Sequence, residues 1–119
     1  FLEDVETFLD LNEVRYTPDV QFTGKSGFQH TFDFVVPASR RMPERLIRAI
    51  NSPTKEKSES IIFSWDDIKK VRQKDSSMFV FVNDKDRAVK SEICGAFAEY
   101  GIQPILWSQK EKAIESLTA

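Results

Sequence analysis

Two carboxylates and the single histidine are the side chains whose types and spacing favour chemistry. Asp33 lies inside the apolar run FDFVV, Glu44 follows after a short proline-containing segment, and His30 is the only histidine of the chain. Carboxylate oxygens are the ligands that Mg²⁺ prefers. An imidazole can carry a proton or contact a phosphate. Asp33, Glu44 and His30 are therefore the candidate catalytic residues, and Asp33 is the candidate metal ligand.

Both Asp33 and His30 also have structural interpretations. A carboxylate among apolar side chains is costly unless it is paired, and Arg45 or Arg48 on the next predicted strand is the expected partner. Asp33 is thus either half of an ion pair or an active-site acid. His30 is either a hydrogen-bonded interior residue or a member of the same cleft as Asp33. Strict alternation puts the two on opposite faces of their strand unless a bulge intervenes.

Basic side chains gather between residues 40 and 57, where six bases stand against two acids. They are Arg40, Arg41, Arg45, Arg48, Lys55 and Lys57. Residues 1–19 have the opposite balance, with six acids against one base. A local basic patch can bind the phosphate backbone of a nucleic acid. A solvated face, or internal pairing with the acidic segment, explains the cluster equally well.

The tripeptide Gly24-Lys25-Ser26 is similar to the end of a phosphate-binding loop. That motif needs another glycine where Asp19 stands, and it must open a helix. The segment instead separates two alternating runs, so it is predicted to be a hairpin turn.

Composition limits the class of protein. The chain has 119 residues, a net charge of −2, 40% hydrophobic residues and one cysteine. These values predict one folded domain and exclude a disulfide framework and a cysteine-based zinc site. No apolar run is long enough to span a membrane. One unpaired cysteine is compatible with a reducing compartment, so a cytoplasmic location is expected. The chain starts without Met and without a secretory pattern, which predicts that it is a fragment of a longer protein.

Hydrophobic periodicity predicts the elements that position these residues. Residues 44–50 fit a strand or a short helix, and the strand is favoured because Asn51-Ser52-Pro53 follows. Helices are expected over the first residues, 54–72, 86–100 and 108–117, and strands over 14–22, 28–36, 44–50, 78–82 and 102–107. The order α-β-β-β-α-β-α-β-α predicts a single α/β domain over residues 1–119, with a mixed sheet flanked by helices.

This order is similar to the core of the PD-(D/E)xK, or restriction-endonuclease-like, superfamily. Those nucleases have an Asp on the second strand and Glu-x-Lys on the third; the two acids hold a divalent metal, and the Lys orients or activates the attacking water. The segment SGFQHTFDFVV puts Asp33 at the position of that Asp, but RLIRAI has Arg48 and Ile50, or Ile47 and Ala49, where Glu and Lys should be. The resemblance implies a degenerate nuclease-like domain without a cofactor. Mg²⁺ is implied only if Glu44, Glu56 or Glu59 replaces the missing acid.

The sequence also resembles the domain-of-unknown-function family DUF1829. The matching stretches are RYTPDVQFTGKSGFQHTFDFVVP, RAINSP and ILWSQ. This resemblance implies that the chain is the C-terminal part of a longer protein, with a bacterial or phage-associated origin and a companion N-terminal domain. It supplies no catalytic residue.

Three functions follow from these observations. The leading hypothesis is a degenerate nuclease-like module that binds DNA, RNA or a protein partner without cutting, in a bacterial or phage conflict system. The first alternative is an active Mg²⁺-dependent nuclease with a migrated active site. The second is a purely protein–protein interaction or dimerisation domain.

Overall fold

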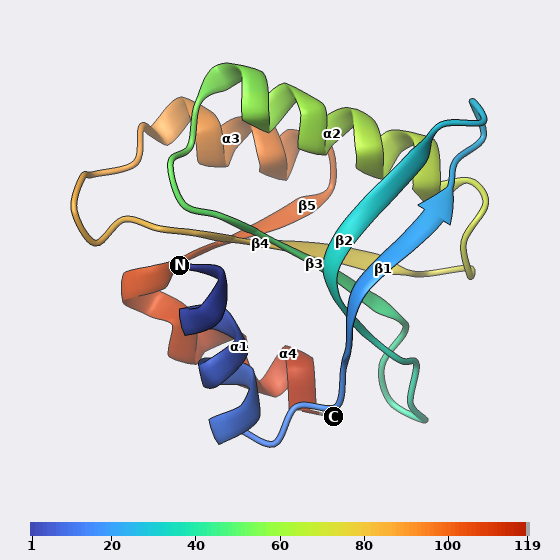
Figure 1. Ribbon diagram of the computed structural model, residues 1–119, viewed down its shortest axis with the longest axis horizontal. Coiled ribbons are helices and arrows are strands. Elements are labelled where there is room, and N and C mark those ends of the chain that lie inside the picture. Colours follow the sequence, from blue (N-terminus) through green and yellow to red (C-terminus); the bar gives the residue numbers. More distant parts are fainter. Residues whose placement is uncertain (119) are drawn as a thin grey trace.

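Five strands form a mixed sheet at the centre of the protein. They are β1 (Thr17–Thr23), β2 (Gln29–Val36), β3 (Arg45–Ile50), β4 (Ser77–Val82) and β5 (Ile102–Leu106). The strands lie side by side in chain order (Figure 1). β2 is antiparallel to both of its neighbours, whereas β3, β4 and β5 are parallel. The computed structural model describes residues 1–118.

Helices cover both faces of this sheet. They are α1 (Leu2–Leu11), α2 (Lys55–Lys69), α3 (Ser91–Glu99) and α4 (Ile114–Thr118), with a 3₁₀ helix η1 (Trp107–Ala113) before α4. α2 and α3 lie on one face and α1 and α4 on the other (Figure 1). α2 and α3 carry the two crossovers that parallel neighbours require. No helix of the described residues is long and apolar enough to cross a membrane.

The predicted order of elements and the α/β class are confirmed. The strand predicted over 44–50 is β3, and Thr54 caps α2 by accepting the backbone N–H of Lys57 at 3.2 Å. Several boundaries were wrong. The strand predicted over 14–22 begins at Thr17, and the helix predicted over 54–72 ends at Lys69. The helix predicted from residue 86 begins at Ser91, because the segment before it is an irregular loop from which Val89 packs onto the core. Ser108 does not cap a helix, because its N–H and hydroxyl both donate to Asp84.

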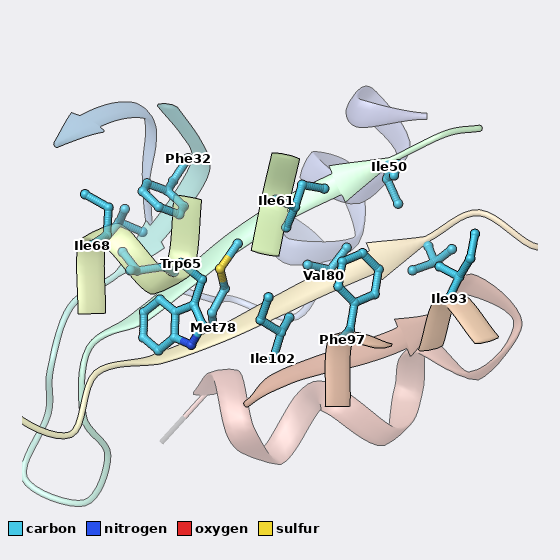
Figure 2. Packing of buried hydrophobic residues seen from close by; sticks show 13 residues of the cluster. Phe32, Ile50, Ile61, Trp65, Ile68, Met78, Val80, Ile93, Phe97 and Ile102 are labelled. Atoms are coloured by element: carbon cyan, nitrogen blue, oxygen red, sulfur yellow. The ribbon is translucent and has the colours of Figure 1, made fainter. Parts of the chain in front are cut away.

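The core consists of two clusters, one on each face of the sheet. Trp65 and Ile68 of α2, Phe97 of α3 and Val80 of β4 belong to the cluster under α2 and α3 (Figure 2). Phe81 of β4 belongs to the cluster under α1 and α4. β4 therefore supplies alternate residues to both clusters. This confirms that it is covered on both faces, as its uninterrupted apolar sequence predicts.

The β1–β2 hairpin changes face midway. Phe34 packs in the α1-side cluster but Phe32 packs in the α2-side cluster, although their even spacing predicts one shared face. The register is the same on both sides of this change, but the pairing skips Asp19 and Asp33, and Asp19 has a φ of 52°. The ladder between β2 and β3 also ends at Phe34. The outer half of the hairpin consequently lies over α2, which places His30 on that side.

Candidate functional site

Asp33 lies where β2 separates from β3. Its Oδ2 accepts the backbone N–H of Ala49 at 2.8 Å and lies 3.4 Å from Nε of Arg48. The guanidinium also donates from Nη1 to the carbonyl oxygen of Thr31 at 3.1 Å. These contacts replace the backbone ladder that has just ended. The predicted ion pair between Asp33 and Arg48 is therefore present.

Metal binding through Oδ2 of Asp33 would have to displace these contacts. Both partners of its Oδ2 are donors, one of them positively charged, so the oxygen is satisfied by the protein itself. Within residues 1–118, no group of three or more His, Cys, Asp or Glu side chains could hold a metal ion. The donor set around Asp33 thus does not fit Mg²⁺, which needs several oxygen ligands.

Glu44 is buried and belongs to a separate contact. Its two oxygens accept hydrogen bonds from Nε and Nη2 of Arg72 at 3.1 and 2.7 Å. The hydroxyl of Ser76 also donates to Oε1 at 3.3 Å. The guanidinium of Arg72 also stacks on the ring of Phe22 at 3.9 Å. Glu44 therefore ties the start of β3 to the segment that follows α2, and it shares no hydrogen-bond partner with Asp33.

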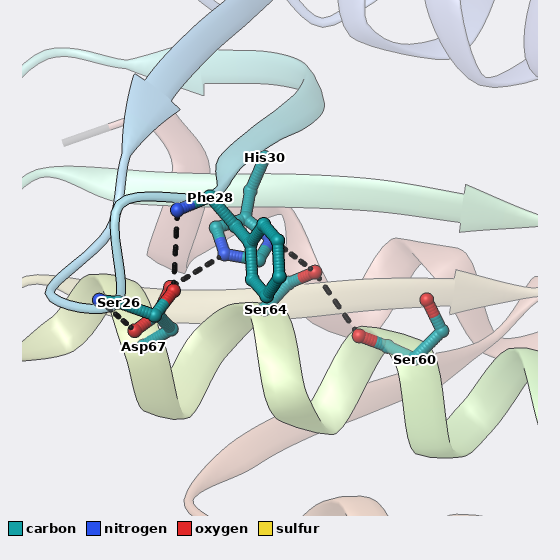
Figure 3. A network of polar contacts seen from close by, with 6 residues as sticks. All are labelled: Ser26, Phe28, His30, Ser60, Ser64 and Asp67. Atoms are coloured by element: carbon teal, nitrogen blue, oxygen red, sulfur yellow. Dashed lines mark hydrogen bonds and ion pairs between the residues drawn. The ribbon is translucent and has the colours of Figure 1, made fainter.

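His30 is buried against α2 and hydrogen-bonded through both ring nitrogens (Figure 3). Its Nδ1 lies 3.0 Å from Oγ of Ser64, and its Nε2 lies 2.8 Å from Oδ2 of Asp67. The ring of Phe63 packs against the imidazole at 5.6 Å. The interior interpretation of His30 is confirmed, and Ser64 and Asp67 take the place of Asp33 as its partners.

The turn at Gly24-Lys25-Ser26 surrounds the carboxylate of Asp67. Ser26 donates its N–H at 2.8 Å and its hydroxyl at 2.6 Å, and Lys25 donates its N–H to the backbone carbonyl of Asp67. A Cβ on Gly24 would lie 2.0 Å from Oδ2 of Asp67. The predicted hairpin turn is confirmed, and the anion it binds is a side chain of the same protein.

These contacts set the charge of the network. The hydrogen bond from the Ser26 hydroxyl lowers the pKa of Asp67, and the contact with His30 lowers it further, although burial acts in the opposite direction. The carboxylate is therefore ionised at neutral pH.

Sequence reasoning did not find Ser64 and Asp67. Both are buried, yet they stand within the apolar stripe of α2 beside Trp65 and Ile68. A serine and an aspartate at helical spacing on the inner face of a helix need an internal partner. The single histidine was the available signal for that partner.

Arg45 must be removed from the predicted basic surface. It is 1% exposed, and it donates from Nη1 to the carbonyl oxygen of Ser116 and from Nη2 to that of Pro37. Its Nε has no hydrogen-bond partner among the described residues, and burial lowers the pKa of the guanidinium. The side chain thus anchors α4 from inside the protein and cannot reach a phosphate.

The other predicted cations do not form one surface. Arg48 is held by Asp33, and the four exposed ones divide between the two ends of β3. Arg40 and Arg41 precede this strand, whereas Lys55 and Lys57 follow it. Six residues of strand separate the groups by roughly 20 Å.

A hollow of about 1200 Å³ lies between α2 and α3, beside the carboxyl ends of β3 and β4. Ligands of open α/β sheets bind at such ends. Lys55 lines this hollow together with Arg87 and Lys90, two cations that sequence reasoning did not select. The lining also includes three acids, several neutral polar residues and apolar or aromatic side chains, among them Glu59, Asp86, Glu92, Ile62, Ile93 and Tyr100.

The fold is a single α/β domain with a five-stranded mixed sheet between two helical layers. In the candidate site, Asp33 is paired with Arg48 of the same chain. Residues 24–110 match the family model described as Domain of unknown function DUF1829. The chain therefore belongs to the DUF1829 family. The matched segment includes Asp33, the His30–Asp67 contact and the hollow. No curated protein matches the chain.

Proposed function

We propose that this domain binds nucleic acid without cutting it. The contact between Asp33 and Arg48 carries the proposal. In the nuclease superfamily that the order of elements resembles, the corresponding acid shares a divalent metal with a second carboxylate, and a lysine orients or activates the attacking water. Here a guanidinium is in contact with the acid instead. Arginine keeps its proton at any useful pH, so it cannot activate a water molecule.

The hollow between α2 and α3 is the surface that fits a nucleic acid best. Lys55, Arg87 and Lys90 are exposed there and can contact phosphates, while Tyr100, 54% exposed, offers a face to an unpaired base. Three carboxylates also line the hollow. Attraction of a phosphate backbone therefore depends on where the individual cations lie and not on the net charge of the hollow. Binding is therefore expected to be modest, salt-dependent and stronger for a single strand than for a duplex.

Fluorescence anisotropy with labelled DNA and RNA, single- and double-stranded, tests this function over a range of salt concentrations. The triple variant Lys55→Ala/Arg87→Ala/Lys90→Ala should bind a single strand at least about tenfold more weakly. Its salt slope should fall by about 2, because each phosphate contact contributes about 0.7. The double variant Arg40→Ala/Arg41→Ala, changed at the other end of β3, is the matched control and should stay near wild type.

Two results would contradict the proposal. Absence of binding at low salt would remove the nucleic-acid function and favour a protein partner. Cleavage with Mg²⁺ or Mn²⁺ that is lost in Asp33→Asn would show an active nuclease. The expected result is that neither wild type nor Asp33→Asn cuts any of the four substrates.

A further inference from the structure

The sheet ends on one side at β5, whose outer edge has no neighbouring strand within residues 1–118. In a parallel ladder, the backbone groups of successive residues alternate between facing the neighbouring strand and facing away. Pro104 pairs with Val80 of β4 but has no N–H to donate, so it is one of the residues that face away. Ile102 and Leu106, two positions to either side, therefore face away from β4 as well.

Four backbone groups stand open along this edge. They are the N–H and C=O of Ile102, the C=O of Pro104 and the N–H of Leu106. Within residues 1–118, no hydrogen bond from a turn, loop or cap backbone group reaches them. Donors and acceptors with the spacing of a strand match the backbone of another strand, which is how extended peptides add to an open sheet.

A groove of about 360 Å³ lies along the same edge. Residues 103–106 of β5 line it, together with Cys94 of α3 and with Gln109, Lys112 and Ser116 of η1 and α4. α3 and α4 lie on opposite faces of the sheet (Figure 1). The groove is therefore bordered from both faces, with the open edge of β5 between its walls.

The opposite edge of the sheet is less suited to a partner strand. β1 contains Pro18, and Asp19 next to it has a left-handed backbone with a φ of 52°. Prolines and local bends are common protections of a sheet edge. No residue of β5 has a positive φ, so β5 offers the more regular edge.

The side chains of the groove indicate the chemistry of its partner. Lys112 is the charged side chain among the lining residues, and it is exposed. Its Nζ donates to Oε1 of Gln109 at 3.1 Å, a neutral partner that does not compensate the charge. A carboxylate on the incoming strand supplies the missing charge. A second copy of this chain fits less well, because two β5 strands paired about Pro104 would bring two carbonyls together with no N–H between them.

We propose that the open edge of β5 is a docking site for an acidic, extended segment of a partner protein, which adds to the sheet as a sixth strand. Backbone hydrogen bonds supply the affinity, and Lys112 selects the acidic side chain. Docking here is independent of nucleic-acid binding, because the groove shares no lining residue with the hollow between α2 and α3.

The probe for this site is the peptide Thr-Val-Thr-Asp-Thr-Val-Thr, blocked at both ends and titrated into ¹⁵N-labelled protein. The amide signals of Ile102 and Leu106 should shift with a dissociation constant of about 0.1–1 mM. The amide of Val20, on the β1 edge, is the reference that should not shift. A peptide with Lys in place of Asp should bind at least about threefold more weakly, and Lys112→Glu should reverse this preference.

Two variants of one residue separate backbone pairing from surface contact. Leu106 has a φ of −66°, which proline adopts, so Leu106→Pro removes the outward N–H without breaking the ladder to β4. Leu106→Ala shortens the side chain but keeps the N–H. Peptide binding should fall at least about tenfold in Leu106→Pro and stay within about threefold of wild type in Leu106→Ala.

Methylated peptides test the same pairing on the wild-type protein. Methyl groups on alternate amides give two peptides, of which one loses the N–H groups that face β5 and should not bind, while the other should bind. No amide shift at about 5 mM peptide, or equal binding by the two methylated peptides or by the Asp and Lys peptides, would overturn the proposal. Shifts of Ile102 and Leu106 that depend on protein concentration without peptide would also overturn it, in favour of a second copy.

Discussion

Oδ2 of Asp33 accepts the N–H of Ala49 and lies 3.4 Å from Nε of Arg48, at the point where β2 leaves β3. One carboxylate oxygen of Asp33 therefore links β2 to β3 beyond the last backbone pair between these strands. Asp33 is 21% and Arg48 30% exposed at the side chain, so the pair is partly screened by water and its net stabilisation is modest. Its larger effect is to fill a position beside Asp33 that a metal ion would need.

Replacing this cation by an acid should create a metal site. In Arg48→Glu, two carboxylates stand side by side, so Mn²⁺ should bind with a dissociation constant of about 1 mM and raise the melting temperature. Wild type should give no binding heat in calorimetry. Arg48→Gln removes the charge without adding a ligand and should behave like wild type. Equal Mn²⁺ binding by all three proteins would show that Arg48 does not block the site.

Glu44 should affect stability and not activity. In Glu44→Gln, the bidentate, charged contact with Arg72 is lost inside the protein, so urea unfolding should show a loss of about 2 kcal/mol. Glu59→Gln, an exposed change on α2, should stay within about 0.5 kcal/mol. If Glu44→Gln instead kept full stability and lost a metal-dependent activity, the catalytic interpretation of Glu44 would return.

Asp67 should determine part of the acid stability. Its pKa in the folded protein is below the ordinary value of 3.8, so its stabilisation is present above that value and is lost as pH falls through the folded pKa. Urea unfolding measured from neutral to acidic pH should therefore show a flatter curve, and lower neutral stability, for Asp67→Asn. Asp66→Asn, next to it on α2, should keep the wild-type slope. Parallel curves for wild type and Asp67→Asn would contradict this assignment.

Two glycines should respond oppositely to alanine. A Cβ at position 24 would meet the Asp67 carboxylate, so Gly24→Ala should open the turn and cost on the order of 2 kcal/mol. Gly95 lies in α3 with open space around it, and Gly95→Ala should add up to about 1 kcal/mol through helix propensity. Thermal or urea unfolding of both variants checks the signs. A stable Gly24→Ala would mean that the turn does not hold Asp67 this closely.

The sequence by itself determined the order of elements, because periodicity and caps are local. Alternation along 14–22 and 28–36 predicted the hairpin, Thr54 predicted the start of α2, and the apolar run MFVFV predicted an interior strand. It also predicted Arg45 or Arg48 as the partner of Asp33, and Arg48 is the one in contact. That pair could be found because residues on neighbouring strands of a hairpin-like segment meet by register alone.

Only the tertiary structure decided which polar groups meet and which are buried. His30 and Asp67 are 37 positions apart, and their contact needs the hairpin to change face at Asp19 and Asp33 and lie over α2. Nearness in sequence likewise did not place Arg41 and Lys55 on one surface, because β3 carries the chain across the sheet between them. Twist, crossover packing and burial act over the whole fold, so the composition of a single segment cannot determine them.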